Sequence, residues 1–110
     1  MTNFIIIYTT FAHRRHAKAL AKKLLKEKLI ACANIFKIDS LYTWKDKLEE
    51  AREYGVFLKT RADLYPQIES EIKNSHPYEL PCIISWEIGK GSLEFLDWIT
   101  ENVKVGSRNL

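Results

Sequence analysis

Two cysteines and three histidines supply the soft metal ligands of this 110-residue chain. They are Cys32, Cys82, His13, His16 and His76. Copper(I) and zinc prefer thiolate and imidazole ligands, and a closed site needs three or four of them. His13 and His16 stand three residues apart at the start of a helical pattern, a spacing that permits chelation. No third ligand accompanies them in a zinc signature, so we expect two exposed imidazoles and, for the whole chain, weak metal binding at most.

The other three candidates each have a structural explanation. Cys32 and Cys82 lie far apart in the sequence and neither belongs to a CxxC pair, so in a reducing compartment we expect free thiols. Cys32 fits a small buried side chain as well as a ligand. His76 precedes Pro77, and a residue before proline commonly ends a helix. The residues alone leave these alternatives open.

No pattern typical of catalysis occurs in the sequence. There is no Ser–His–Asp order, no pair of carboxylates at a catalytic spacing and no glycine-rich phosphate loop. The segment 9–15 leads into a helical pattern whose N-terminus attracts anions, but it contains no glycine. We therefore expect that the protein is not an enzyme.

Composition narrows the class of protein further. The chain is 46% hydrophobic and 28% charged with 4 glycines and 3 prolines, which excludes a disordered or collagen-like chain. A net charge of +3 is too balanced to indicate a nucleic-acid partner. The apolar run near the N-terminus is too short for a signal peptide or a membrane span, so we expect a cytoplasmic protein without membrane contact. The length predicts a single domain over residues 1–110.

Hydrophobic periodicity predicts the order strand, helix, strand, strand, helix, strand, helix. Strand patterns cover residues 4–10, 30–36 with 40–44, 53–60 and 80–88, and helical patterns cover about 13–29, from 63 to the break at 74–77, and from 92 onward. The polar stretch from Lys45 to Arg52 predicts a hairpin tip, Asp63 and Ser92 are expected to cap helices, and residues 106–110 to fray. We predict an α+β, ferredoxin-like βαββαβ sandwich with a long β2–β3 hairpin and an extra C-terminal helix.

Apolar and aromatic side chains crowd the predicted hairpin. They are Leu41, Tyr42, Trp44, Tyr54, Val56 and Phe57. A sheet with helices on one face leaves its other face and both edges open, and apolar patches of this kind mark association surfaces. We therefore predict that the chain self-associates.

Several short motifs occur in a fixed order along the chain. They are Ala31–Ile35, Ser40–Lys45, Glu53, Leu58–Thr60 and His76–Pro81. Together they resemble the CutA family of divalent-cation tolerance proteins over nearly the whole chain. The resemblance implies a homotrimer related to PII signalling proteins and a role in tolerance of divalent metal ions, mainly copper.

The resemblance also bears on the candidate residues. It favours Cys32 and His76 as ligands of copper or another divalent metal. Tyr8 stands where some members have a cysteine, so we expect weak binding and no metal requirement for folding. Asp46 stands where the family has a glycine, and Cys82 where it has a glutamate.

A second interpretation follows from the same resemblance. PII-like signalling trimers bind small effectors in clefts between subunits, and here aromatic walls with a few charges could line such a cleft. The candidate residues are Tyr42, Trp44, Glu53, Lys59, Pro77 and Tyr78. The structural alternative is that Tyr42 and Trp44 pack in an interface and that Lys59 pairs with Glu53 across the hairpin.

Overall fold

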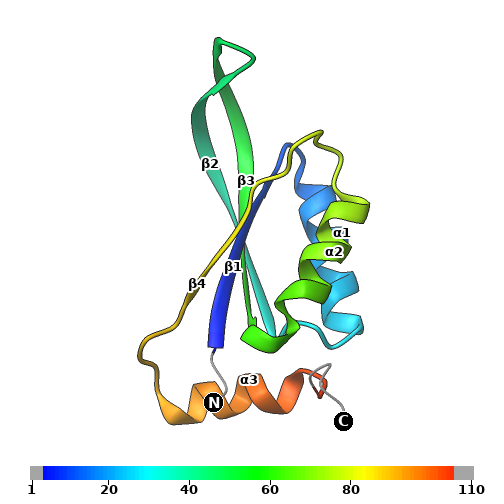
Figure 1. Ribbon diagram of the computed structural model, residues 1–110, viewed down its shortest axis with the longest axis vertical. Helices are drawn as coiled ribbons and strands as arrows, with labels where there is room; N and C mark the ends of the chain where they lie inside the picture. Colours follow the sequence, from blue (N-terminus) through cyan, green and yellow to red (C-terminus); the bar gives the residue numbers. More distant parts are fainter. Residues whose placement is uncertain (1–3, 106–110) are drawn as a thin grey trace.

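A computed structural model describes residues 4–105, where four strands form one antiparallel sheet (Figure 1). The elements are β1 (Phe4–Phe11), α1 (Arg14–Lys26), β2 (Cys32–Trp44), β3 (Lys47–Arg61), a 3₁₀ turn (Ala62–Leu64), α2 (Tyr65–Ser75), β4 (Ile83–Glu87) and α3 (Leu93–Asn102). The order across the sheet is β2-β3-β1-β4. This confirms the ferredoxin-like sandwich with a long hairpin and a third helix.

The alternation of side chains along each strand decides which face of the sheet the helices cover. On β1, Ile5 and Ile7 point toward the helices and are buried, and on β3 Val56 and Leu58 do the same. α1 and α2 pack on this face and nowhere on the other (Figure 1). Because successive residues of a strand point to opposite faces, the neighbours of these residues form a second face without a helical cover.

The hairpin turn is much shorter than predicted. Trp44 pairs with Lys47, and the turn consists of Lys45 and Asp46 with φ angles of 51° and 67°. Two left-handed residues make the turn whose twist matches that of paired strands. The prediction of a tip from Lys45 to Arg52 is wrong, because the charged residues from Lys47 onward belong to a regular strand exposed to solvent.

The first helix ends earlier than its apolar pattern predicts, at Lys26 rather than near residue 29. The amide of Lys28 donates to the carbonyl of Leu25, and the amide of Leu29 donates to that of Leu24. Lys28 has a φ of 58°. This is the Schellman pattern, which reverses the chain while keeping an apolar contact across the helix end. Leu29 is therefore buried although it lies outside the helix.

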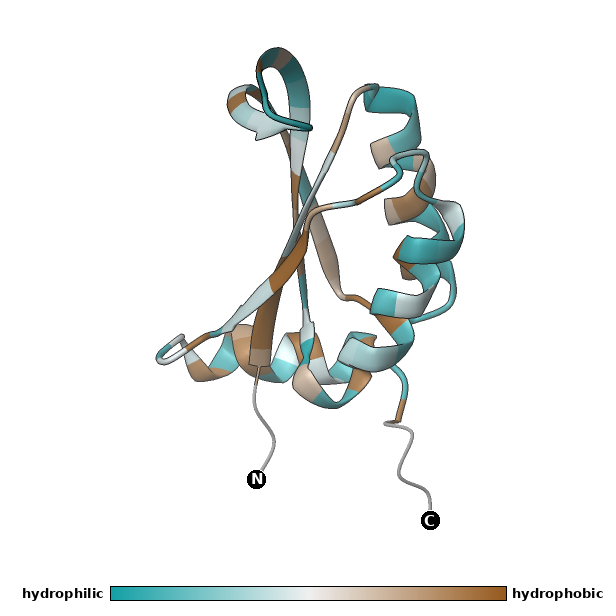
Figure 2. Ribbon diagram, turned by 45° about the horizontal axis from the view of Figure 1, so that its top comes forward, coloured by the Kyte–Doolittle hydropathy of each residue, from teal (hydrophilic) through white to brown (hydrophobic). Residues whose placement is uncertain are grey.

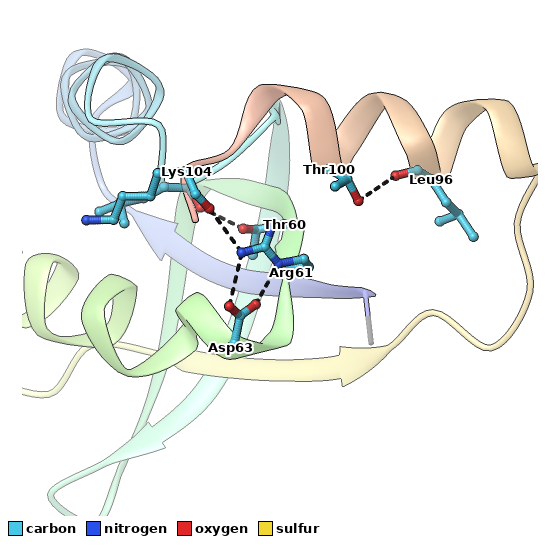
Figure 3. A network of polar contacts seen from close by, with 7 residues as sticks. Thr60, Arg61, Asp63, Leu96, Thr100 and Lys104 are labelled. Carbon is cyan, nitrogen blue, oxygen red and sulfur yellow. Dashed lines mark hydrogen bonds and ion pairs between the residues drawn. The ribbon is translucent and has the colours of Figure 1, made fainter. Parts of the chain in front are cut away.

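Asp63 does not cap α2, contrary to the prediction. Its carboxylate accepts hydrogen bonds from Nε of Arg61 at 2.8 Å and from a terminal guanidinium nitrogen at 3.0 Å. The same guanidinium donates to the carbonyl of Lys104 at 3.0 Å (Figure 3). Arg61 is almost fully buried, so this pairing both neutralises its charge and ties the end of β3 to the segment after α3.

Two predictions about helix starts are confirmed, and the predicted bounds of the last strand are too wide. Ser92 caps α3, its hydroxyl accepting from the amide of Phe95 at 3.1 Å, and Pro66 lies in the first turn of α2, both as predicted. β4 is shorter than the predicted 80–88. The predicted fraying of residues 106–110 lies outside the described residues. Among residues 4–105, no helix has the length and apolar character required to cross a membrane.

The strand order separates the two cysteines. β2 and β4 form opposite edges of the sheet; Cys32 begins β2 and Cys82 immediately precedes β4. Both are free thiols. A disulfide requires Cα atoms within about 7 Å, so the expectation of free thiols within one chain is confirmed.

Thr9 and Thr60 offer a matched test of packing in this core, because both are fully buried on neighbouring strands. Oγ1 of Thr9 has no hydrogen-bond partner within residues 4–105, whereas Oγ1 of Thr60 donates to the carbonyl of Leu29 at 2.6 Å. We predict that Thr9→Val raises the free energy of unfolding by about 1 kcal/mol and that Thr60→Val lowers it by about 1–3 kcal/mol. Urea denaturation at one fixed protein concentration measures both, and equal effects would contradict the prediction.

Candidate site on the open face of the sheet

Four aromatic rings, one from each strand, meet on the face that α1 and α2 leave uncovered. Phe57 of β3 lies at the centre, with ring centroids 4.9 Å from Phe36, 5.8 Å from Tyr8 and 5.9 Å from Trp86. We call Tyr8, Phe36, Phe57 and Trp86 the open-face aromatic cluster. Figure 2 shows apolar residues along the central strand β1. Trp86 remains 43% exposed, so the cluster is an apolar surface rather than a closed core.

Gly55 makes room for this cluster. It pairs with Phe36 across the β2–β3 ladder, and a Cβ atom at this position would lie 2.9 Å from the Phe36 ring and 3.2 Å from the Tyr8 ring. The contact with Phe36 is shorter than carbon atoms adopt and the contact with Tyr8 is tight, so a larger residue would displace the Phe36 ring. Glycine at this position therefore lets the two aromatic side chains lie over the strand as they do.

A buried carboxylate lies next to the cluster. Glu53 is only 6% exposed, and its Oε2 accepts a hydrogen bond of 2.5 Å from the hydroxyl of Tyr78. No basic side chain among residues 4–105 forms an ion pair with Glu53. A carboxylate removed from water without a cation is costly unless donors satisfy it, so the phenol of Tyr78 is its principal compensation within the described chain.

The acidic groups around Glu53 are held in their protonated forms. Burial, followed by the hydrogen bond to Glu53, raises the pKa of Tyr78 far above its ordinary value. Burial and the negative charges of Cys82 and Glu53 raise the pKa of Tyr8, and burial and Glu53 raise that of Cys82. The Cys82 thiol is thus kept from its nucleophilic, metal-binding thiolate form.

His76 is fixed in one position by both of its ring nitrogens. Nε2 lies 2.7 Å from the carbonyl of Thr10, and Nδ1 accepts from the amide of Tyr78 at 3.1 Å. Because a carbonyl only accepts, Nε2 carries the proton and the ring is neutral. The ring also stacks on Phe11 with centroids 4.2 Å apart. His76 therefore holds the turn that delivers Tyr78 to Glu53.

The structure does not bring Cys32 and His76 together within one chain. Cys32 pairs with Lys59, whereas His76 binds Thr10, which pairs with Gly55. Gly55 and Lys59 are four residues apart on β3, about 13 Å at 3.3 Å per residue. Residues 4–105 of one chain contain no group of three His, Cys, Asp or Glu side chains arranged to hold a metal ion.

Of the six candidate cleft residues, Lys59 lies apart from Glu53 and Tyr78, and the other three are placed as follows. Glu53 and Tyr78 are in contact, and Tyr42 is close enough to raise the pKa of Tyr78 further. Pro77 is exposed in the turn between His76 and Tyr78. Trp44 ends β2 beside Lys45, whose Nζ lies 3.8 Å from a carboxylate oxygen of Glu79 in the segment before β4.

Lys59 belongs to the other end of the sheet. Its Nζ lies 5.7 Å from the centre of the Phe95 ring on α3, and it is six residues from Glu53 along the same strand. The alternative that Lys59 pairs with Glu53 across the hairpin is therefore wrong. Lys59 is a neighbour of Cys32, not of the carboxylate.

Sequence reasoning missed part of the open-face aromatic cluster and included one residue wrongly. Of the hairpin residues expected on an association surface, Val56 is fully buried in the chain's own core. Tyr8, Phe36 and Trp86 were not expected to meet Phe57. Alternation along each strand could have indicated that these three aromatic side chains face away from the helices. Which of them lie next to Phe57 depends on the register between the strands, and the sequence does not show that register.

The histidine pair at the start of α1 lies apart from this site. His13 is the N-cap residue of α1 with extended backbone angles and makes no capping hydrogen bond, and its ring lies edge-on to that of His16 at 5.6 Å. His13 is exposed as expected, whereas His16 is half-buried.

Protonation of His76 should couple stability to pH. Burial lowers the pKa of His76 below its ordinary 6.5, with His16 acting in the same direction and the Thr10 carbonyl and Glu53 acting against it. The unfolded chain then binds this proton more readily, so stability is present above about pH 6.5 and is lost as the pH falls below it. We predict that His76→Gln flattens the decline of the melting temperature between pH 7.5 and 5.5, whereas His13→Gln keeps it. A parallel decline in both variants would contradict this.

Comparison with known proteins finds one matching family and several relatives. Residues 5–102 match the family model described as CutA1 divalent ion tolerance protein. The divalent-cation tolerance protein CutA of Pyrococcus horikoshii is 43% identical over 91% of this chain and 98% of its own, and human protein CutA is 30% identical over 86% and 53%.

Solved structures agree with these matches. CutA1 of Ehrlichia chaffeensis superposes with a TM-score of 0.89 at 35% identity, over 96% of this chain and 99% of its own. A CutA structure from Archaeoglobus fulgidus, described as periplasmic, superposes with a TM-score of 0.88 at 43% identity, over 94% and 100%.

Proposed function

We propose that this chain, which belongs to the CutA1 family of divalent ion tolerance proteins, acts as a cytoplasmic homotrimer without enzymatic activity and binds divalent metal ions, mainly copper, weakly. The open-face aromatic cluster carries this proposal. It is an apolar surface on the sheet face that α1 and α2 leave uncovered (Figure 1), and association buries it. The number of three protomers follows the family resemblance.

The sheet edges and the open face favour the same mode of association. β2 is an edge strand of 13 residues, and β4 forms the other edge. On β4, Ile84 is 53% exposed and lies on the same face as Trp86. An exposed edge beside an apolar face is the combination that proteins normally cover.

Weak metal binding follows from the positions of the two ligand candidates. Since Cys32 and His76 lie at different ends of one sheet, an ion bound by both must lie between protomers. His76 would have to give up either the Thr10 carbonyl or the Tyr78 amide to bind it. That lost hydrogen bond offsets part of the binding free energy.

The absence of an enzymatic role is supported by the state of the polar groups. Glu53 already accepts from Tyr78, His76 uses both ring nitrogens, and burial disfavours the thiolate of Cys82. A nucleophile or general base needs a free lone pair directed at a substrate. Glu53 and His76 are instead engaged in hydrogen bonds to Tyr78 and to the backbone.

Two side chains of nearly equal exposure test the assembly. Trp86 on the open face is 43% exposed and Leu25 on α1 is 42% exposed. We predict that Trp86→Ser weakens the trimer at least tenfold and that Leu25→Ser leaves it intact, because only the first side chain is buried between protomers. Light scattering over a dilution series in 300 mM NaCl measures both. A wild-type chain that stays a folded monomer at micromolar concentration would refute the assembly.

Copper titration tests the ligands. We predict that isothermal titration calorimetry detects weak Cu²⁺ binding to the wild-type protein that Cys32→Ser with His76→Ala abolishes, whereas the matched pair Cys82→Ser with His13→Ala retains it. Affinity should fall in acid, because binding requires a neutral imidazole and a thiolate. A chelator should barely shift the melting temperature, unlike in a structural zinc domain. Equal affinity in the wild type and the first variant would exclude Cys32 and His76.

A small effector between subunits is a second candidate function. The observation that favours it is the convergence of Tyr42, Glu53 and Tyr78, which combines aromatic walls with a carboxylate that no cation among residues 4–105 pairs with. Native mass spectrometry of untagged protein reports subunit number and any retained ligand together. A retained organic cation, with copper affinity unchanged by the Cys32 and His76 substitutions, would favour this function over metal binding.

A further inference from the structure

The charges of this chain are separated between two helices. α1 contains six basic residues and no acidic one, whereas α3 contains three acidic residues and no basic one. The net charge of the whole chain is only +3, and the residues outside α1 and α3 are neutral overall when Lys, Arg, Asp and Glu are counted. Charge separation of this size within one small protein creates two surfaces of opposite potential.

The basic surface forms a regular row. Arg15, Lys18 and Lys22 are exposed and follow one another at three and four residues, which we call the basic ladder. At 100° per residue this row lies opposite the buried residues of α1, such as Ala17 and Leu24. None of the three ladder residues forms an ion pair within the described chain.

The acidic surface has the same spacing. Glu94, Asp97 and Glu101 are exposed on α3, also at three and four residues, and form no ion pair with other residues between 4 and 105. We call these three residues the acidic ladder. They lie opposite Ile99, the fully buried residue of α3. In both ladders the successive rises along the helix are about 4.5 and 6 Å.

An exposed tryptophan accompanies the acidic ladder. Trp98 follows Asp97 directly, is 40% exposed and stacks on Phe95 with centroids 5.5 Å apart. The face of an indole ring attracts lysine and arginine side chains. The α3 surface thus combines three carboxylates with an aromatic ring, and both features attract cations.

The basic ladder lies away from the open face, and the acidic ladder lies at the end of the sheet (Figure 1). α1 lies on the opposite side of the sheet from the open-face aromatic cluster, and α3 crosses the end of the sheet (Figure 1). On each helix the ladder residues lie on the side opposite the residues that pack in the core. An association through the open face therefore leaves the basic ladder on the outside.

We propose that the basic ladder of one copy docks on the acidic ladder of a second copy of this chain, which joins trimers into larger assemblies at low ionic strength. The ladders have opposite charge and equal spacing, so three ion pairs form together. α1 contains no Phe, Tyr or Trp for stacking on bases, and its apolar face is buried in the core and cannot enter a membrane. A second copy is thus the occupant that the two surfaces fit.

The physical character of this contact determines its behaviour. Exposed ion pairs are individually weak and are screened by salt, but several pairs on each of several protomers act together. The two surfaces differ, so the contact is head-to-tail and does not close on itself in a pair. The assembly should therefore grow with concentration at low salt and dissociate to the basal oligomer at moderate salt.

Sedimentation velocity of the full chain at 20 and 300 mM NaCl tests this proposal. We expect the weight-average mass at 20 mM to exceed that at 300 mM by at least twofold at about 100 µM protein. Lys18→Glu with Lys22→Glu, or Asp97→Lys with Glu101→Lys, should each remove the excess, and combining all four substitutions should restore it with the ladders exchanged. Circular dichroism confirms that the variants, altered only at exposed positions, remain folded.

A charge-matched control separates ladder docking from net charge. Lys28→Glu with Lys90→Glu changes the net charge by the same amount as the basic-ladder variant, at two exposed positions outside the ladder and outside the strands, and should keep the low-salt growth. Equal wild-type masses at both salt concentrations, or no recovery in the exchanged variant, would overturn the proposal. The mass at 300 mM reports the basal oligomer separately, so failure of the ladders and failure of the trimer are distinguishable.

Discussion

The strict alternation of side chains along the central strand β3 is the constraint on which the rest of this structure depends. Val56 and Leu58 face the helices and are fully buried, whereas Gly55 and Phe57 face the other way. Two helices are enough to cover only one side of a four-stranded sheet. The second side carries apolar rings that no element among residues 4–105 covers (Figure 1), and the proposed association rests on this imbalance.

The polar groups beside the open-face aromatic cluster are tightly paired because the aromatic rings partly exclude water from them. Glu53 lies on a strand position that faces the aromatic side, where water is partly excluded, and Tyr78 supplies the donor that it needs. Tyr78 reaches it only because His76 fixes the turn after α2 against β1. The hydrogen bonds of His76 thus hold this turn in place, and the metal binding proposed for His76 would compete with them.

The errors of sequence reasoning have a common cause. The polar stretch after Trp44 resembles a loop in composition, yet it is a strand because β2 continues beside it and supplies hydrogen bonds. Asp63 has the type and position of a helix cap, but the guanidinium of Arg61 is a stronger partner. In both cases a specific hydrogen-bonding partner, the neighbouring strand or the guanidinium two residues away, outweighs the preference that composition suggests.

The sequence by itself determined the order of elements, the apolar face of each helix, the cap at Ser92 and the motifs that indicate the CutA family. These features depend on neighbours within a few residues, which periodicity and local hydrogen bonding can reveal. Only the tertiary structure decided that Tyr8, Phe36 and Trp86 surround Phe57, that Glu53 lies with Tyr78 rather than Lys59, and that Cys32 and His76 are apart. Those relations depend on strand register, which long-range pairing sets and a single sequence does not display.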